Sequence, residues 1–552
     1  MSSNFQSPRS YSADDIDREI VKIDMREKEN AIKRRQLRTL RNLLVVSGRL
    51  PPELLRDIFL YTASSRSWAL DAAPNPVSQV CHYWRLLALS IPAIWSHIHF
   101  GQFKWALEQL KRSGIHPLAV MVPQNRLHSI SLPIITSILT QGHRLQHVSV
   151  FANTEAHMVE VVEALRSPAP NAETLILKVV FNATGRFVLP NDILGTDRIR
   201  LRRLRLRGCC VDWSVFDFHR LVDLRIKFLE SAPCQNRPSL QAFVGVLGAL
   251  KMVRTLILHH CLPLNDWSVE IIPLSVSLPH LLRLEVCDEL PNVAFLVNQL
   301  CVRHHATVIL RVVHVGEEDD DIADLVFYGS SISGCDTSLA SLFVSKVADE
   351  HVIVRGRRQS AEASVPIAIG DVDFTFDLSW DVWQIRSLAE SAMAVVHHLL
   401  GEHTLFLTLD DVGALSEEIW VDVSRVCFRL RYLHVENETA SSLIPLLTPR
   451  NRARTVGEQR SAFLFPTLHT LSFRAINLTD FRISRLFDAL VQRSSVMGSL
   501  PLLMIRDCDV ANPAHINYLG SAVGSLDWDG HCMRLVDDDI QSDVSTNVGA
   551  DD

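Results

Sequence analysis

A short apolar pattern recurs along most of this chain and constrains its fold more than any other feature. In each copy, an apolar residue is followed at the third and fifth positions by two more. Apolar residues two apart lie on the same face of a β-strand, so each copy predicts a strand with one buried face. A single strand cannot bury that face alone, and the copies must therefore stack. The copies begin at Leu145, Ala172, Leu201, Leu221, Val253, Leu281, Leu430, Leu468 and Leu500.

Successive copies are separated by about 20 to 38 residues, and several are followed by a cysteine, as at Cys209, Cys261 and Cys508. This pattern resembles irregular leucine-rich repeats, in which each unit contributes one strand to a solenoid. We therefore expect an α/β fold in which residues 101–536 form an irregular leucine-rich-repeat horseshoe. Residues 310–400 lack the pattern. They are either a large loop followed by degenerate repeats or a break between two half-solenoids.

Residues 50–95 have a helical pattern instead. Pro51 and Pro52 suit the first turn of a helix, where a missing N–H costs nothing. Apolar residues then follow at helical spacing: Leu54, Leu55, Ile58, Phe59 and Tyr61. A second helix is predicted from Asn75 and Pro76 to Pro92, with one face made of Val77, Val80, Cys81, Trp84, Leu87 and Ala88. A unit this small needs a partner or the following domain to pack against.

Residues 48–100 resemble the F-box, and more narrowly the F-box-like proteins of mushroom-forming fungi. The residues that carry the resemblance are, in order, Leu50, Pro51, Glu53, Leu55, Ile58, Phe59, Val80, Cys81, Trp84, Leu87, Ala88, Pro92 and Trp95. The link from Ser64 to Pro76 departs from the family's pattern because it lacks regular leucines.

The resemblance implies a substrate-recognition subunit of an SCF-type cullin ubiquitin ligase, which performs no covalent chemistry itself. The box would bind a Skp-type linker protein that reaches the cullin, and the repeats would hold a protein substrate. The resemblance assigns linker contacts to Leu50, Pro51, Leu55, Ile58, Phe59, Val80 and Trp84.

A second role also fits these residues, that of a leucine-rich-repeat scaffold or adaptor outside any ligase. The box-like helices would then cap the solenoid, whose terminal apolar face is otherwise exposed. Solvent exposure separates the two roles. A docking box leaves Leu55, Ile58, Phe59 or their neighbours open to solvent, whereas a cap buries the whole stripe against the repeats.

A charged helix is predicted at residues 13–47, after a Ser-rich segment, residues 1–12, that we expect to be disordered. Ile16, Ile20 and Ile23 begin an apolar seam, but polar residues interrupt it before Leu37. An interrupted seam favours a helix packed on its own domain over a coiled coil.

Strand alternation also predicts which charged side chains share the outer face of the repeats. In the copy that begins at Leu201, the side chains of Leu204 and Leu206 point inward. The arginines that alternate with these two leucines point outward. We hypothesise that the outward cations capture an acidic or phosphorylated segment of a target, because guanidinium groups bind carboxylate and phosphate bidentately. The alternative is a solvated face balanced by the acidic run at 317–321. The candidate cations are Arg203, Arg205, Arg207, Arg225 and Lys227.

Composition excludes several classes of protein. A net charge of −7 and a pI near 6.4 argue against a nucleic-acid or membrane-surface partner. Eleven cysteines without a CxxC pair, and no signal-like or membrane-spanning run, favour the cytoplasm or nucleus. Motifs for a nucleophile, zinc or a dinucleotide are absent, so we expect no enzyme activity, cofactor or metal. Residues 537–552 predict an acidic disordered tail.

Overall fold

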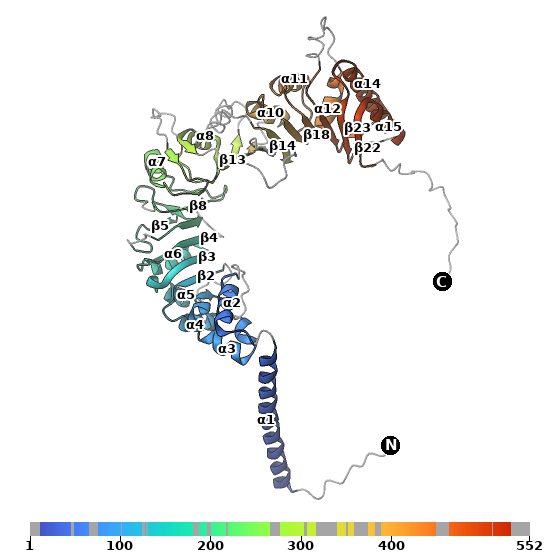
Figure 1. Ribbon diagram of the computed structural model, residues 1–552. Helices are drawn as coiled ribbons and strands as arrows, with labels where there is room; N and C mark the ends of the chain where they lie inside the picture. The colour runs from blue at the N-terminus through green and yellow to red at the C-terminus, as the bar shows by residue number, and fades with distance from the viewer. Residues whose placement is uncertain are drawn as a thin grey trace, which may run out of the picture. The chain divides into compact units, whose positions relative to one another are not determined.

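The computed structural model forms two compact units, which are described separately (Figure 1). The first contains residues 1–183 and 189–203, and the second residues 184–188 and 204–552. The tail at 537–552 and residues 1–11 of the predicted disordered segment 1–12 lie outside the described residues, whereas Ser12 is described. The described residues are 12–45, 49–65, 76–100, 102–123, 127, 131–179, 187–195, 200–216, 219–264, 276–302, 306–315, 339–348, 351–357, 374–380, 388–448, 463–510 and 512–530.

The first unit begins with helix α1 (Ala13–Leu44), as the sequence predicts. At its start the backbone N–H of Ser12 donates to the Asp15 carboxylate at 3.3 Å, which caps the helix. Every described side chain of α1 except those of Asp15 and Asn42 is exposed. The expectation that this helix packs on its own domain is therefore wrong.

Four short helices follow: α2 (Pro52–Ser65), η2 (Pro76–Gln79), α3 (His82–Leu89) and η3 (Pro92–Trp95). The prediction of one continuous helix between Pro76 and Pro92 is wrong. The backbone is extended at Cys81 (φ −156°, ψ 171°), and the Cys81 thiol accepts a hydrogen bond from the N–H of Trp84. Cys81 therefore caps α3 and separates it from η2. Asn75 lies outside the described residues.

Four parallel strands make the sheet of the first unit: β1 (His97–His99), β2 (Leu118–Val122), β3 (Leu145–Ala152) and β4 (Thr174–Val179). The helical segments between them are α4 (Phe103–Arg112), α5 (Leu132–Leu139), η5 (Gly142–Arg144) and α6 (Glu155–Ala164). Because η3 ends at Trp95, the box helices lead directly into β1.

The second unit continues this design with four neighbouring strands, β6 (Arg203–Arg207), β8 (Asp223–Lys227), β9 (Thr255–His259) and β11 (Arg283–Glu289). Helices α7 (Leu240–Ala249) and α8 (Leu290–Gln299) lie along one side of these strands (Figure 1). Short strand pairs complete this part: β5 (Val188–Leu189) with β7 (Cys210–Val211), and β10 (Val276–Leu278) with β12 (Leu300–Val302).

The sheet runs through the stretch at 310–400, where the sequence left a loop or a break open. The strands there are β13 (Thr307–Val315), β14 (Ser341–Ala348), β15 (His351–Arg357), β16 (Phe374–Trp380) and β17 (Phe406–Asp410). Hydrogen bonds join them in the order β13, β16, β15, β14, β17, with β15 antiparallel to both neighbours. Helix α10 (Leu388–Leu399) precedes β17. The antiparallel strand β15 therefore interrupts the series of parallel strands. The sheet nevertheless continues from β13 to β17 within the second compact unit.

Parallel strands resume with β18 (Tyr432–Glu436), β19 (Thr470–Arg474), β21 (Leu500–Arg506) and β23 (Val523–Trp528). A further short pair is β20 (Asn477–Leu478) with β22 (Asp509–Val510). The remaining helices are α11 (Glu417–Val426), α12 (Asn437–Leu443), η6 (Ile444–Leu447), α14 (Asp480–Met497) and α15 (Pro513–Ala522).

The recurring apolar pattern is confirmed as a strand at every copy. At the third and fifth positions of the copies the side chains are buried, as for Leu256 and Leu258, which are fully inaccessible to solvent. The backbone then turns into the left-handed region directly after five of these strands, and also after β17. The residues in this conformation are Gly208 (φ 67°), His260 (51°), Asp411 (50°), Asn437 (49°), Ala475 (52°) and Asp507 (49°). The result is a mixed α/β fold with a large, mostly parallel sheet in the second unit.

Candidate partner-binding surfaces

The helices of the first unit enclose a small apolar core. Leu55 and Phe59, both fully buried, pack there with the half-buried ring of Trp84, whose centroid lies 5.0 Å from that of Phe59. Trp95 closes the core, and its indole N–H donates to the Ala88 carbonyl at 2.8 Å. The other buried members are Val77, Ala88, Ile91 and Ile94. The core therefore exists without help from a partner chain.

Trp95 of this core packs against two side chains of α4, Trp105 and Arg112. The rings of Trp95 and Trp105 meet edge to face with centroids 5.8 Å apart, and the Arg112 guanidinium lies 4.6 Å from the Trp95 ring centroid. Such an arrangement combines apolar contact with cation–π attraction. The box helices are thus joined to the sheet of their own unit through α4 and β1.

The opposite side of α2 remains open to solvent. The exposed fractions of Leu54, Ile58 and Tyr61 are 51%, 42% and 73%, and that of Val80, beyond α2, is 59%. Pro51 is also exposed, whereas Leu50 is half-buried. The stripe on α2 therefore divides into an inner part, which carries the core, and an outer part. We call the outer residues Pro51, Leu54, Ile58, Tyr61 and Val80 the box surface.

A pocket of about 340 Å³ adjoins the start of α2. Its walls come from α2, α3, η3 and the turn after α4, and they include Arg56, Leu87, Pro92 and His116. Glu53 and Arg56 line the pocket beside apolar residues such as Leu87, a combination that suits an amphipathic side chain of a partner.

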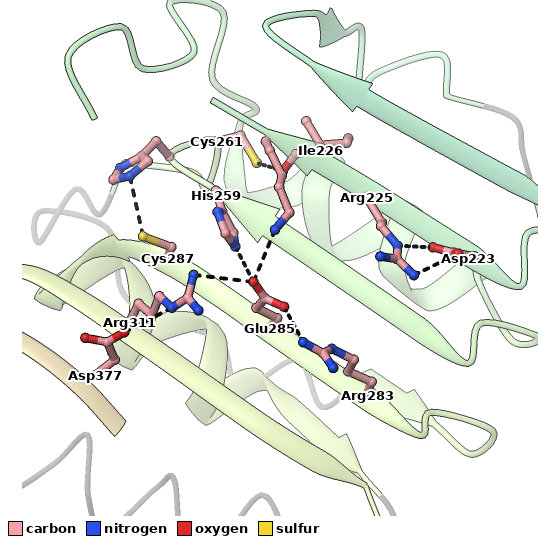
Figure 2. Close-up of polar contacts among 12 residues, drawn as sticks. Asp223, Arg225, Ile226, His259, Cys261, Arg283, Glu285, Cys287, Arg311 and Asp377 are labelled. Carbon is pink, nitrogen blue, oxygen red and sulfur yellow. Dashed lines mark hydrogen bonds and ion pairs between the residues drawn. The ribbon is translucent and has the colours of Figure 1, made fainter. Parts of the chain in front are cut away.

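In the second unit, the face opposite the buried leucines carries a network of ion pairs centred on Glu285 (Figure 2). The Glu285 carboxylate is 2.8 Å from an Arg283 nitrogen, 3.2 Å from Lys227 Nζ and 3.6 Å from an Arg311 nitrogen. Its fourth neighbour is His259 Nε2 at 3.0 Å. These side chains meet because β8, β9, β11 and β13 lie side by side in parallel register.

Hydrogen bonds from His259, Arg283 and Lys227 outweigh burial and hold the pKa of Glu285 well below its usual range. Burial lowers the pKa of His259, against the opposing effect of its bond to Glu285. We therefore assign a neutral His259 that donates its Nε2 proton to an ionised Glu285.

Two further carboxylates extend the network along the same face. Asp223 accepts from Arg205 Nε at 3.1 Å and from Arg225 Nε at 2.7 Å. Asp377 pairs with Arg311 Nε at 3.1 Å and also binds His351. The five cations Arg205, Arg225, Lys227, Arg283 and Arg311, which we call the cation cluster, therefore share three carboxylates.

The structure places the predicted cations in two groups. Arg205, Arg225 and Lys227 are half-buried and bound to carboxylates, whereas Arg203 and Arg207, at the ends of β6, are exposed. Strand alternation could find the side chains on this face. It could not identify Glu285 as their common partner, because that depends on the register between β8, β9 and β11.

Carboxylates predominate at the other end of the second unit. Asp410, Glu436, Asp507 and Asp527 lie there with two arginines, Arg474 and Arg506. Burial and the neighbouring Glu436 raise the pKa of Asp410 to about 6. Burial opposes ionisation of Glu436 too, but hydrogen bonds from His434 and Asp410 lower its pKa to about 2. Asp410 therefore holds the proton that this pair shares.

Comparison with known proteins adds no family assignment. No protein-family model matches the chain, and a search of the curated proteins found no match. Among the described residues, no cluster of His, Cys, Asp and Glu side chains has an arrangement that could hold a metal ion. Within the same residues, no helix is both long and apolar enough to cross a membrane.

Proposed function

We propose that this chain is the non-catalytic substrate-recognition subunit of an SCF-type cullin ubiquitin ligase. The observation that carries the proposal is the divided stripe of α2. Leu55 and Phe59 build a core of their own, and the box surface beside them is left uncovered. An apolar face with these properties is suited to a helical partner such as a Skp-type linker.

Within this proposal the residues assigned by resemblance have two roles. Leu55 and Phe59 are buried and position α2, and the half-buried Leu50 and Trp84 support them. Pro51, Ile58 and Val80 contact the linker, together with their neighbours Leu54 and Tyr61. The linker in turn joins the chain to the cullin.

Co-expression with a Skp-type linker protein tests this role. We expect the two proteins to co-purify, and Ile58→Asp to abolish the complex because it places a charge in the contact. Ile115→Asp is the matched control, since Ile115 is 92% exposed and lies in the turn after α4. If the folded wild-type chain does not bind the linker, the scaffold role with the box helices as a cap is the better account.

For the second unit, we propose irregular leucine-rich repeats arranged as a horseshoe that holds the protein substrate. The cation cluster and the exposed Arg207 would receive an acidic or phosphorylated segment. Five cations sharing three carboxylates leave positive charge on that face, and an incoming anion would complete the pairing.

Peptide binding tests the target site, with an oligoglutamate peptide and a phosphoserine peptide as probes. We expect affinity for at least one, falling as salt is raised because the attraction is screened. Arg207→Glu should weaken binding. Arg220→Glu, an exposed arginine outside the strands, should not. Equal binding by both variants would contradict the proposed site.

A further inference from the structure

Helix α1 is long, and its described side chains are exposed apart from those of Asp15 and Asn42. Its 32 residues span about 48 Å at the usual rise of an α-helix. Apolar side chains along it are open to water: the exposed fractions are 50% for Ile20, 48% for Ile23 and 58% for Leu37. Isolated helices are marginally stable in water, and most gain their stability from packing of an apolar face. The protein therefore has an element that needs a partner.

Five of the apolar residues on α1 fall on one seam, whereas Val21, Met25, Ile32 and Leu40 lie outside it. Ile16, Ile23, Leu37 and Leu44 are separated by multiples of seven, and Ile20 lies between the first two. Spacings of four and three are those of the core positions in a coiled coil. The same seam continues through polar residues, namely Glu27, Asn30, Arg34 and Arg41. The partner must therefore accommodate both kinds of residue.

Charge along α1 is divided between its two halves. Residues 13–29 carry seven carboxylates and four cations, whereas residues 30–44 carry five cations and no carboxylate. The first half is thus acidic and the second strongly basic. A second copy of the same helix, running in the opposite direction, has a complementary distribution.

The two possible directions of pairing differ sharply. A parallel pair places Glu27 against Glu27 and Arg34 against Arg34, with like charges facing each other at the core. An antiparallel pair with full overlap places Ile20 opposite Leu37 and Glu27 beside Asn30. In that register Ile23 packs on the stem of Arg34, and Ile16 on that of Arg41.

We propose that α1 forms an antiparallel coiled coil with α1 of a second copy, making the chain a homodimer. Asp17 of one helix then lies near Arg38 of the other, on the flank of the core. The proposal does not depend on the function of the box or of the repeats.

Sedimentation of the full-length chain tests the association. We expect a concentration-dependent dimer, and a monomer for Ile20→Lys, which puts a charge in the apolar layer. Ile32→Lys is the matched control because Ile32 is 59% exposed and lies on the side of the helix away from the seam. This variant should remain dimeric. A wild-type chain that stays monomeric at high concentration would overturn the proposal, leaving α1 as a lone helix supported by intrahelical pairs such as Arg18 with Asp15.

Cysteine cross-linking tests the direction. Ile16→Cys and Arg41→Cys are made in chains with tags of different size, mixed, and oxidised, with the wild-type chain as background for the native thiols. The antiparallel pair predicts a disulfide between the two different variants. Cross-links of Ile16→Cys chains with each other would show a parallel pair and overturn the proposal.

Discussion

At the scale of single residues, Glu285 determines the character of the charged face in the second unit. Its side chain is only 5% exposed, so its charge is stabilised by neighbouring side chains more than by water. Arg283 is on the same strand as Glu285, β11, whereas Lys227 approaches this carboxylate from β8 and Arg311 from β13. Glu285 therefore links β8, β11 and β13 electrostatically as well as through the backbone.

Glu285→Gln should lower the free energy of unfolding by about 2 kcal/mol, because the surrounding cations lose their counter-charge. Urea denaturation at neutral pH measures this. Glu289→Gln is the control, since Glu289 ends the same strand but is exposed, and its effect should stay within about 0.5 kcal/mol. Equal effects of the two variants would show that the network does not stabilise the fold.

Asp410 predicts a dependence of stability on pH. Its pKa in the folded chain, about 6, lies above the ordinary value of 3.8, so its ionisation destabilises the fold as the pH rises through this window. Asp410→Asn should therefore raise the free energy of unfolding by about 1 kcal/mol at pH 8. At about pH 3, below the ordinary value of 3.8, the gain should nearly vanish, because the carboxyl is then mostly protonated in the unfolded chain as well as in the folded one. Urea denaturation of both proteins at the two pH values measures this gain in free energy of unfolding. A gain of equal size at both pH values would show that it does not come from ionisation of Asp410.

At the scale of elements, a left-handed residue follows several of the strands, although not all of them. Ala475 has a φ of 52°, which a residue with a Cβ adopts at a cost of roughly 1 kcal/mol. Gly208 follows β6 in the same conformation without that cost. The shape of this turn is thus maintained even where the residue type does not favour it.

Ala475→Gly should raise the free energy of unfolding by about 0.5 kcal/mol, since the relief of strain exceeds the entropy added to the unfolded chain. Thermal unfolding measures the change. The same substitution at Ala514, in helix α15, should be destabilising because the backbone there is helical. Loss of stability at both positions would mean that Ala475 is not strained.

The elements were predicted from sequence where a simple period governed them. Apolar residues two apart located strands such as β9 and β19, because alternation alone decides which face of a strand is buried. The break at Cys81 was missed because a thiol is an uncommon helix cap and interrupts no apolar spacing. The antiparallel strand β15 was missed because a reversed strand has the same alternation as a parallel one. Likewise, no local pattern could show that Phe59 lies inside and Ile58 outside, since both fit the same helical stripe.

At the scale of the whole molecule, the solvent exposure of the cysteine thiols indicates how well the described residues are packed. Seven of the described cysteines are buried, Cys81 is partly accessible and Cys301 is exposed. Burial raises the pKa of Cys287 and of Cys427 to about 12, which keeps both as thiols at neutral pH. Cys335 and Cys532 lie outside the described residues.

Thiol titration of the native chain, with Cys335 and Cys532 replaced by Ser, should show one fast-reacting group, Cys301, and a slower one, Cys81. The buried thiols should react only on unfolding, because the thiolate is the reactive form and burial disfavours it. The variant Cys301→Ser should remove the fast phase. Rapid reaction of many thiols in the folded chain would contradict the packing described for both units.

The left-handed residue that follows many of the strands also bears on how such a chain can evolve. Each repeat whose strand ends in this turn directs the backbone the same way, whatever the length of the segment that follows. A unit can therefore be duplicated, lost or lengthened by recombination while its neighbours keep their register. Intervals of about 20 to 38 residues between copies are the expected record of such a history, and new side chains can be brought to the charged face one unit at a time.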